Sequence, residues 1–108
     1  MLTELQREHL ETLLRMKLPE PYKVIGDIAI RVHPMTYGKG RLCIGHVDDW
    51  CGYEFGYCYT SPEEAFAAAD AWDGTGEPQG WMKNLQTGRY RKNGDPAKEY
   101  GPDDKEPD

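Results

Sequence analysis

Four side chains of the types that zinc prefers lie within one short segment, Cys43, His46, Cys51 and Cys58, with His33 as a spare. The spacing lacks the closely paired ligands of a zinc knuckle or ribbon. On a regular strand, Cys43 and His46 would also point to opposite faces. Three cysteines in a chain without an export signal favour reduced thiols. We therefore expect structural cysteines, with no metal and no cofactor.

A nucleophilic cysteine is the second chemistry that this segment could support. Cys51 lies in a predicted turn beside Asp49, and His46 and His33 could supply a base. Catalysis would also need an oxyanion site and a base within hydrogen-bonding reach. The chain of 108 residues is short for a conventional hydrolase. We therefore expect a protein that is not an enzyme.

Aromatic side chains recur at every second position between residues 53 and 60. On a strand they would share one face, which consists of Tyr53, Phe55, Tyr57 and Tyr59. Such a face can stack on nucleic-acid bases, pack as a core, or contact another protein. The chain has a net charge of −6, which opposes general affinity for phosphates. We therefore favour a core face with a protein-interface edge over a nucleic-acid surface.

One basic segment lies between two acidic ones. The net charge is −5 over residues 61–80, +4 over residues 81–94 and −4 over residues 95–108. The basic segment could contact phosphate or an acidic protein surface, or it could pair with the flanking acids. We predict that partner-binding residues lie here and in a polar turn upstream. They are Trp81, Arg89, Tyr90, Arg91 and Lys92, with Asp48, Asp49 and Trp50.

The elements that must position these residues follow an α-β-β-β-α order. A helix is predicted over residues 3–17, where Thr3 and Gln6 form a capping box. Alternating apolar residues predict strands over 22–33, 41–47 and 53–60, joined as an antiparallel meander. The second helix begins at Ser61-Pro62, a natural N-cap followed by a proline, and runs to about Trp72. The predicted fold class is therefore α+β.

The C-terminal part is predicted to hold less regular structure. Residues Trp81–Arg91 could form a hairpin that turns at Gln86-Thr87-Gly88. We predict one domain over residues 1–94 and an extended, disordered acidic tail over residues 95–108. No apolar run approaches the ~20 residues of a membrane span, and Met1–Glu4 does not resemble a secretory signal. We expect a cytoplasmic protein, and an open sheet edge would allow a homodimer.

A distinctive set of residues marks the C-terminal half: Ala71-Trp72-Asp73-Gly74, Glu77-Pro78, Gly80-Trp81, Thr87-Gly88-Arg89, Arg91, Gly94-Asp95-Pro96 and Glu99-Tyr100. With the preceding strand and helix, this pattern resembles short uncharacterised proteins of bacteriophages and prophages over residues 53–100. The resemblance implies a phage accessory protein in the host cytoplasm. Such proteins often bind and block a host factor, including CRISPR-type defence complexes. The resemblance supplies no functional residues.

A second, weaker resemblance covers the junction between the third strand and the second helix. The segment Gly56–Ala65 is similar to the strand-to-helix junction of HicB-type antitoxins. That similarity implies a nucleic-acid-binding regulator, but no DNA-binding segment follows the helix. Our leading hypothesis is a protein that binds and modulates or inhibits a host bacterial protein. The alternative is an antitoxin-like regulator that uses exposed aromatics with Arg89 and Arg91.

Overall fold

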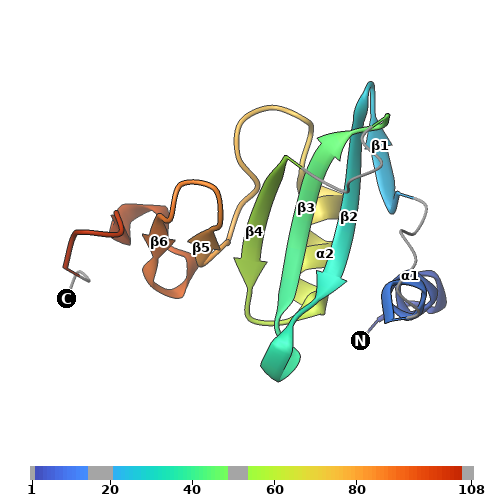
Figure 1. The fold of residues 1–108 in the computed structure, drawn as a ribbon, viewed down its shortest axis with the longest axis horizontal. Helices are drawn as coiled ribbons and strands as arrows, with labels where there is room; N and C mark the ends of the chain where they lie inside the picture. The colour runs from blue at the N-terminus through green and yellow to red at the C-terminus, as the bar shows by residue number, and fades with distance from the viewer. Residues whose placement is uncertain (1, 15–20, 49–53, 106–108) are drawn as a thin grey trace.

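The computed structural model describes residues 2–14, 21–48 and 54–105, and it has an α+β fold with two helices and a seven-stranded antiparallel sheet. Each strand pairs with the next one in sequence, from β1 to β7. Figure 1 shows α2 behind β2, β3 and β4, and α1 beside the edge of the sheet near β1 and β2. The elements are α1 (Glu4–Leu14), β1 (Lys23–Ile25), β2 (Ile28–Pro34), β3 (Gly40–His46), β4 (Phe55–Tyr59), α2 (Pro62–Ala71), β5 (Lys83–Asn84), β6 (Tyr90–Arg91) and β7 (Glu99–Tyr100).

The predicted strand over residues 22–33 is two strands, β1 and β2, joined by a tight turn. Gly26 has a φ of 58°, a left-handed value that glycine adopts without steric cost. The chain reverses there, and Val24 pairs with Ala29. Val24 therefore lies 53% exposed rather than on the buried face with Ile30. The prediction missed this turn because Gly26 fits the alternating pattern.

The reversal at Gly26 places Lys23 at the end of α2. Its ammonium donates to the carbonyl oxygens of Ala69, Asp70 and Trp72 at 2.9, 3.2 and 2.8 Å. The last carbonyls of a helix have no partner within the helix, and a cation stabilises this negative end. Lys23 therefore ties the first strand to the second helix.

The main core lies between the sheet and α2. The small residues Ala65 and Ala69 are fully buried and let the helix lie close to the strands. The strands contribute branched and aromatic side chains to the same cluster, Ile30, Val32, Leu42, Ile44, Tyr57 and Tyr59. As predicted, Tyr57 and Tyr59 are core residues. Phe55 on the same face is 40% exposed, and Tyr53 lies outside the described residues.

Both helices begin where the capping signals predicted. In α1, the amide of Gln6 donates to Thr3 Oγ1 at 3.1 Å, and the amide of Thr3 donates to Gln6 Oε1 at 3.0 Å. In α2, the amide of Glu64 donates to Ser61 Oγ at 3.2 Å. The Glu64 carboxylate, however, accepts from the hydroxyl of Thr60. The predicted end of α1 at residue 17 lies outside the described residues.

Helix α1 covers the part of β2 that the short strand β1 leaves open. Strand β1 pairs with Ile28–Ile30 of β2. The pairing does not extend toward Pro21, two residues before β1, because proline cannot donate an amide hydrogen bond. Further along β2, the amide of Val32 donates to Nε2 of His9 at 3.0 Å. His9 is 7% exposed, and its ring meets those of Tyr22 and Phe66 edge to face. The helix thus completes the edge of the sheet with a side chain.

Residues 81–100, here called the arm, extend the sheet beyond the predicted meander. Strands β5 and β6 form the predicted hairpin, in which Lys83 pairs with Tyr90, and β5 also pairs with β4. Strand β7 then pairs with β6 through Tyr90 with Tyr100 and Arg91 with Glu99. The sheet therefore continues past residue 94, where we predicted an extended tail. The described residues 95–105 therefore do not show the disordered acidic tail that we predicted.

Candidate binding cleft

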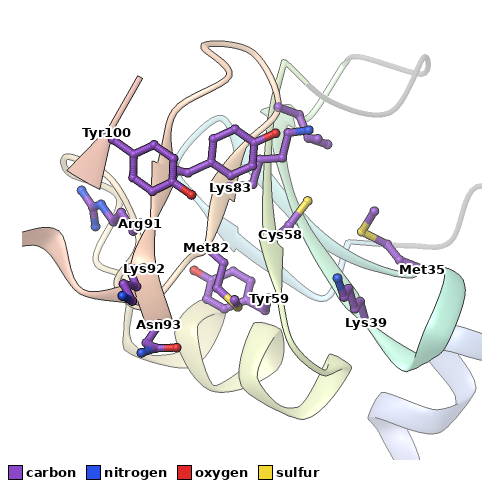
Figure 2. A pocket seen from close by; sticks show the side chains of 12 residues that line it. Met35, Lys39, Cys58, Tyr59, Met82, Lys83, Arg91, Lys92, Asn93 and Tyr100 are labelled. Atoms are coloured by element: carbon purple, nitrogen blue, oxygen red, sulfur yellow. The ribbon is translucent and has the colours of Figure 1, made fainter. Parts of the chain in front are cut away.

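A cleft of about 400 Å³ lies between the arm on one side and β4 with the β2–β3 connection on the other (Figure 2). One wall comes from the β2–β3 connection and another from the arm. The cleft forms because β5 pairs with residues 57 and 58 of β4 while the arm turns away at its far end. The lining residues are Met35, Lys39, Cys58, Tyr59, Met82, Lys83, Leu85, Tyr90, Arg91, Lys92, Asn93 and Tyr100.

The charge of the lining is opposite to that of the chain. Lys39, Lys83, Arg91 and Lys92 are cationic, and no Asp or Glu occurs among the described residues that line the cleft. The chain as a whole has a net charge of −6. A concave wall concentrates the field of the charges along it. The cleft is therefore a region of local positive charge in a protein with a net negative charge.

Two tyrosines and a lysine of the lining form a stack, of which Tyr100 and Lys83 are seen in the upper part of Figure 2. The rings of Tyr90 and Tyr100 lie 5.4 Å apart with an interplanar angle of 14°. The ammonium of Lys83 lies 5.1 Å from the centroid of the Tyr90 ring. Contact with the Tyr90 hydroxyl raises the pKa of Lys83, so this ammonium stays charged at neutral pH. The ring of Tyr90 therefore packs against two side chains of the protein itself, Tyr100 and Lys83.

The interior of the cleft is apolar and rich in sulfur. Met35 and Met82 are partly buried, and Cys58 lies between them and the tyrosine stack in Figure 2. Burial raises the pKa of Cys58, which keeps its side chain in the thiol form. A thiol of this kind is a poor nucleophile. The sulfur-lined surface is therefore suited to contact rather than to reaction.

Behind the cleft, Trp81 carries two guanidinium groups. Its side chain is 0% exposed, and Arg91 and Arg89 lie 4.0 and 5.3 Å from the ring centroid. Glu77 and Glu99 pair with both arginines, and the shortest contact of each arginine is 2.7 Å from Arg89 to Glu77 and 3.1 Å from Arg91 to Glu99. This cluster, here called the Trp81 cage, neutralises the arginines within the protein.

Two buried groups connect the Trp81 cage to the sheet. Asn84 is 1% exposed and donates from Nδ2 to Glu77 Oε2 at 3.1 Å. Its Oδ1 accepts from the amides of Gln86 and Thr87 and so holds the predicted hairpin turn. Burial and the neighbouring Glu77 carboxylate raise the pKa of Tyr57 to about 12. The cage therefore fixes the position of the arm against β4.

The predicted partner-binding residues of the basic segment lie in two places, the cleft and the Trp81 cage. Tyr90, Arg91 and Lys92 line the cleft. Trp81 and Arg89 lie in the cage instead, where Trp81 is fully buried.

The polar turn that we predicted as a second contact lies elsewhere. Asp48 is exposed after the end of β3, and its amide donates to His46 Nδ1 at 3.1 Å. Asp49 and Trp50 lie outside the described residues. The described part of this turn does not contribute to the cleft lining.

Sequence reasoning missed Lys39, Lys83 and Tyr100 as cleft residues. Lys39 lies between two glycines. These glycines predict a turn, but they do not predict that the turn lines a cleft. Tyr100 falls in the segment that we predicted as a tail. The signal that could have found it is its spacing from Tyr90 across Asn93-Gly94, a turn sequence that brings two strands together.

The cysteines and histidines do not gather into a metal site within the described residues. No group of three or more His, Cys, Asp or Glu side chains there could hold an ion, although Cys51 lies outside those residues. Cys43 is 1% exposed, and burial raises its pKa to about 12. His46 lies exposed on the opposite face of β3, as the strand parity predicted.

Comparison of the chain with protein-family models, with curated proteins and with solved structures finds no match in any of the three. Within the described residues, neither helix is long and apolar enough to cross a membrane. We therefore argue the function from the cleft.

Proposed function

We propose that the protein is a non-enzymatic binding protein that engages a host bacterial protein through the cleft. The observation that supports this is the lining: the three lysines Lys39, Lys83 and Lys92, with no carboxylate among the described lining residues, around a sulfur-rich apolar interior. The resemblance of the C-terminal pattern to phage accessory proteins suggests that binding modulates or inhibits the host factor. A CRISPR-type defence complex in the host cytoplasm is one such target.

The use of the tyrosines favours a protein partner over a nucleic acid. Single-stranded nucleic acids bind to proteins largely by stacking bases on aromatic faces. Tyr90 has Tyr100 against one side and the Lys83 ammonium near its ring, so it offers little surface to a base. Arg89 and Arg91, which a regulator would use for phosphate, are paired with Glu77 and Glu99. The antitoxin-like alternative therefore lacks both of its expected contacts.

The test is an affinity capture from nuclease-treated bacterial lysate with a charge-reversal variant and a matched control. Lys39→Glu with Lys92→Glu reverses two cleft cations. Lys98→Glu with Lys105→Glu makes the same change in charge at two exposed residues outside the cleft lining. Circular dichroism verifies that both variants are folded.

We expect one host protein to be recovered with the unmodified chain and with the control, and lost with the cleft variant. Equal recovery of the host protein with both variants would show that the cleft does not contribute to binding. An empty capture from the nuclease-treated lysate, with nucleic acid recovered when the nuclease is omitted, would favour the regulator instead.

A further inference from the structure

We infer that the cleft binds an extended acidic peptide segment that carries one aromatic side chain between its carboxylates. This deepens the proposed function and rests on it, since it names the part of the partner that enters the cleft. Three independent features of the lining carry the inference: the placement of the cations, the sulfur-rich interior, and a side-chain amide at the rim.

The cations lie on different walls of the cleft rather than in one cluster. In Figure 2, Lys39 lies on the wall next to Met35, whereas Lys92 lies on the arm across the cleft. Lys83 lies at a third point, beside the tyrosine stack. A single small anion would contact one of these walls at a time. A chain with carboxylates on both sides of a central residue would reach several of them together.

The interior between these cations suits one large ring. Its volume of about 400 Å³ falls within the range of roughly 300–1,000 Å³ that is usual for ligand pockets. Met35, Met82 and Cys58 present sulfur atoms to this space. Thioethers make favourable contacts with aromatic rings, and the flexible Met side chain adapts to the shape of a partner. The residue at the centre of the segment is therefore aromatic.

Asn93 provides the contact that a peptide backbone needs. It lies exposed at the rim, and its side-chain amide makes no hydrogen bond within the described residues. A carboxamide has both a donor and an acceptor, which match the C=O and N–H of one peptide unit. Its backbone has a φ of 54°, a left-handed conformation that Asn tolerates better than most residues. The turn thus holds this amide beside the cations.

The inference is tested by fluorescence anisotropy with the full chain and labelled short peptides. The first peptide has one Phe at its centre and Asp residues on both sides. A second has Ala in place of Phe, and a third has Lys in place of each Asp. Single-stranded oligothymidylate serves as an anion without carboxylates. Each probe is titrated with the unmodified chain, with Lys39→Glu plus Lys92→Glu, and with the control Lys98→Glu plus Lys105→Glu.

We expect the Phe peptide to bind about 10-fold more tightly than the Ala peptide and the Lys peptide not to bind. The cleft variant should weaken binding of the Phe peptide by at least about 10-fold, and the control by less than about twofold. A third variant, Asn93→Gly, removes the amide, keeps the left-handed turn, and should weaken binding about threefold without loss of fold. Equal affinity for the Phe and Ala peptides would overturn the aromatic anchor. Tighter binding of oligothymidylate would overturn the peptide segment.

Failure of this inference is distinguishable from failure of the proposed function. If the Phe peptide does not bind but capture of a host protein still depends on Lys39 and Lys92, the segment is wrong and the binding function stands. If neither the peptide nor the captured protein depends on these lysines, both are wrong. The two experiments use the same variants, so a difference in folding cannot separate them.

Discussion

The two parts of the sheet are stabilised by different interactions. Strands β1 to β4 pack with α2 around side chains such as Ile30, Val32 and Phe66, each no more than 1% exposed. The arm has one large apolar side chain with no exposure, that of Trp81, and surrounds it with guanidinium and carboxylate groups. The first region is a conventional apolar core. The second is a cluster of charges on an indole ring.

The difference follows from the length of the strands. Strands β5, β6 and β7 have two residues each, so they can turn few side chains toward a shared interior. A ring that packs against two arginines uses both the apolar stems and the charges of those residues. Few residues therefore stabilise the arm, and many of its other side chains line the cleft. Its stability should depend on salt, whereas that of the core should not.

The largest effect is expected in the apolar core. Phe66→Ala should lower the free energy of unfolding by about 3–5 kcal/mol, because it removes a buried ring and leaves a cavity. Hydrogen exchange should accelerate in the sheet and in the arm together, since β5 of the arm pairs with β4. Leu5→Ala, at a side chain that is 65% exposed, is the control and should cost less than about 1 kcal/mol. Retention of sheet protection in Phe66→Ala would contradict the assignment of the core.

The Trp81 cage should respond to the loss of one guanidinium. Arg91→Gln removes a group that lies 4.0 Å from the Trp81 ring centroid and pairs with Glu77 and Glu99. We expect a cost of about 2–3 kcal/mol that is confined to the arm. Hydrogen exchange should accelerate over residues 83–100 and remain slow over residues 28–46.

Salt provides the control for this prediction. Raising the salt concentration should weaken the protection of the arm in the unmodified chain and have less effect in Arg91→Gln. Arg7→Gln, an exposed change in α1, should alter neither. Loss of protection across the whole sheet in Arg91→Gln would show that the two regions unfold as one.

Protonation of His33 in acid should destabilise the sheet. Burial, with the nearby charges of Arg41, His9 and Arg31, lowers the pKa of His33 from 6.5 to about 4. Between these values the unfolded chain binds a proton that the folded chain does not, so stability falls as the pH falls from 6.5 toward 4. Above pH 6.5 this contribution is constant.

The size of the acid effect is set by partial burial of the ring. We expect a loss of about 2 kcal/mol, less than the full shift would give, because the ring is partly accessible to water. Urea denaturation of the unmodified chain and of His33→Gln at several pH values measures it. The same slope in both proteins would assign the pH dependence to another group.

The smallest effect is expected at the start of α2. Ser61→Ala removes the oxygen that accepts from the Glu64 amide at 3.2 Å and should cost about 1 kcal/mol. Ser61→Asp keeps an acceptor and should retain most of the stability. Thermal unfolding followed by circular dichroism compares the three proteins. A melting temperature unchanged by the Ala substitution would mean that Pro62 alone defines the start of the helix.

The elements that could be predicted are those with signals inside a few residues. Thr3 with Gln6, and Ser61 with Pro62, announce helix starts through contacts between near neighbours. The hairpin at Gln86–Gly88 has the same local character. The turn at Asn93-Gly94 before β7 is also local, but no local signal shows that Glu99 of this two-residue strand reaches Arg89 and Arg91.

The candidate site was predicted less well than the fold, and the reason is burial. Trp81 beside Arg89 and Arg91 reads as an exposed patch in the sequence, since nothing local shows that Glu77 pairs with both arginines. Lys39 and Lys92 are far apart in sequence and acquire a shared role when the arm folds against β4. Within the basic segment, Trp81, Arg89 and Arg91 therefore form the Trp81 cage, whereas Lys92 lines the cleft.

The sequential order of the strands has a consequence for how the chain acquires its function. Every strand pairs with its neighbour in sequence, and all of these pairings except that of β4 with β5, which are joined through α2, close a short loop and lose little chain entropy. Folds with such local connections tend to form fast. The region up to α2 can be complete while the arm is still being synthesised. The cleft has walls from both regions, so we expect it to form last, and ligand binding would then report that synthesis and folding have reached the final strand.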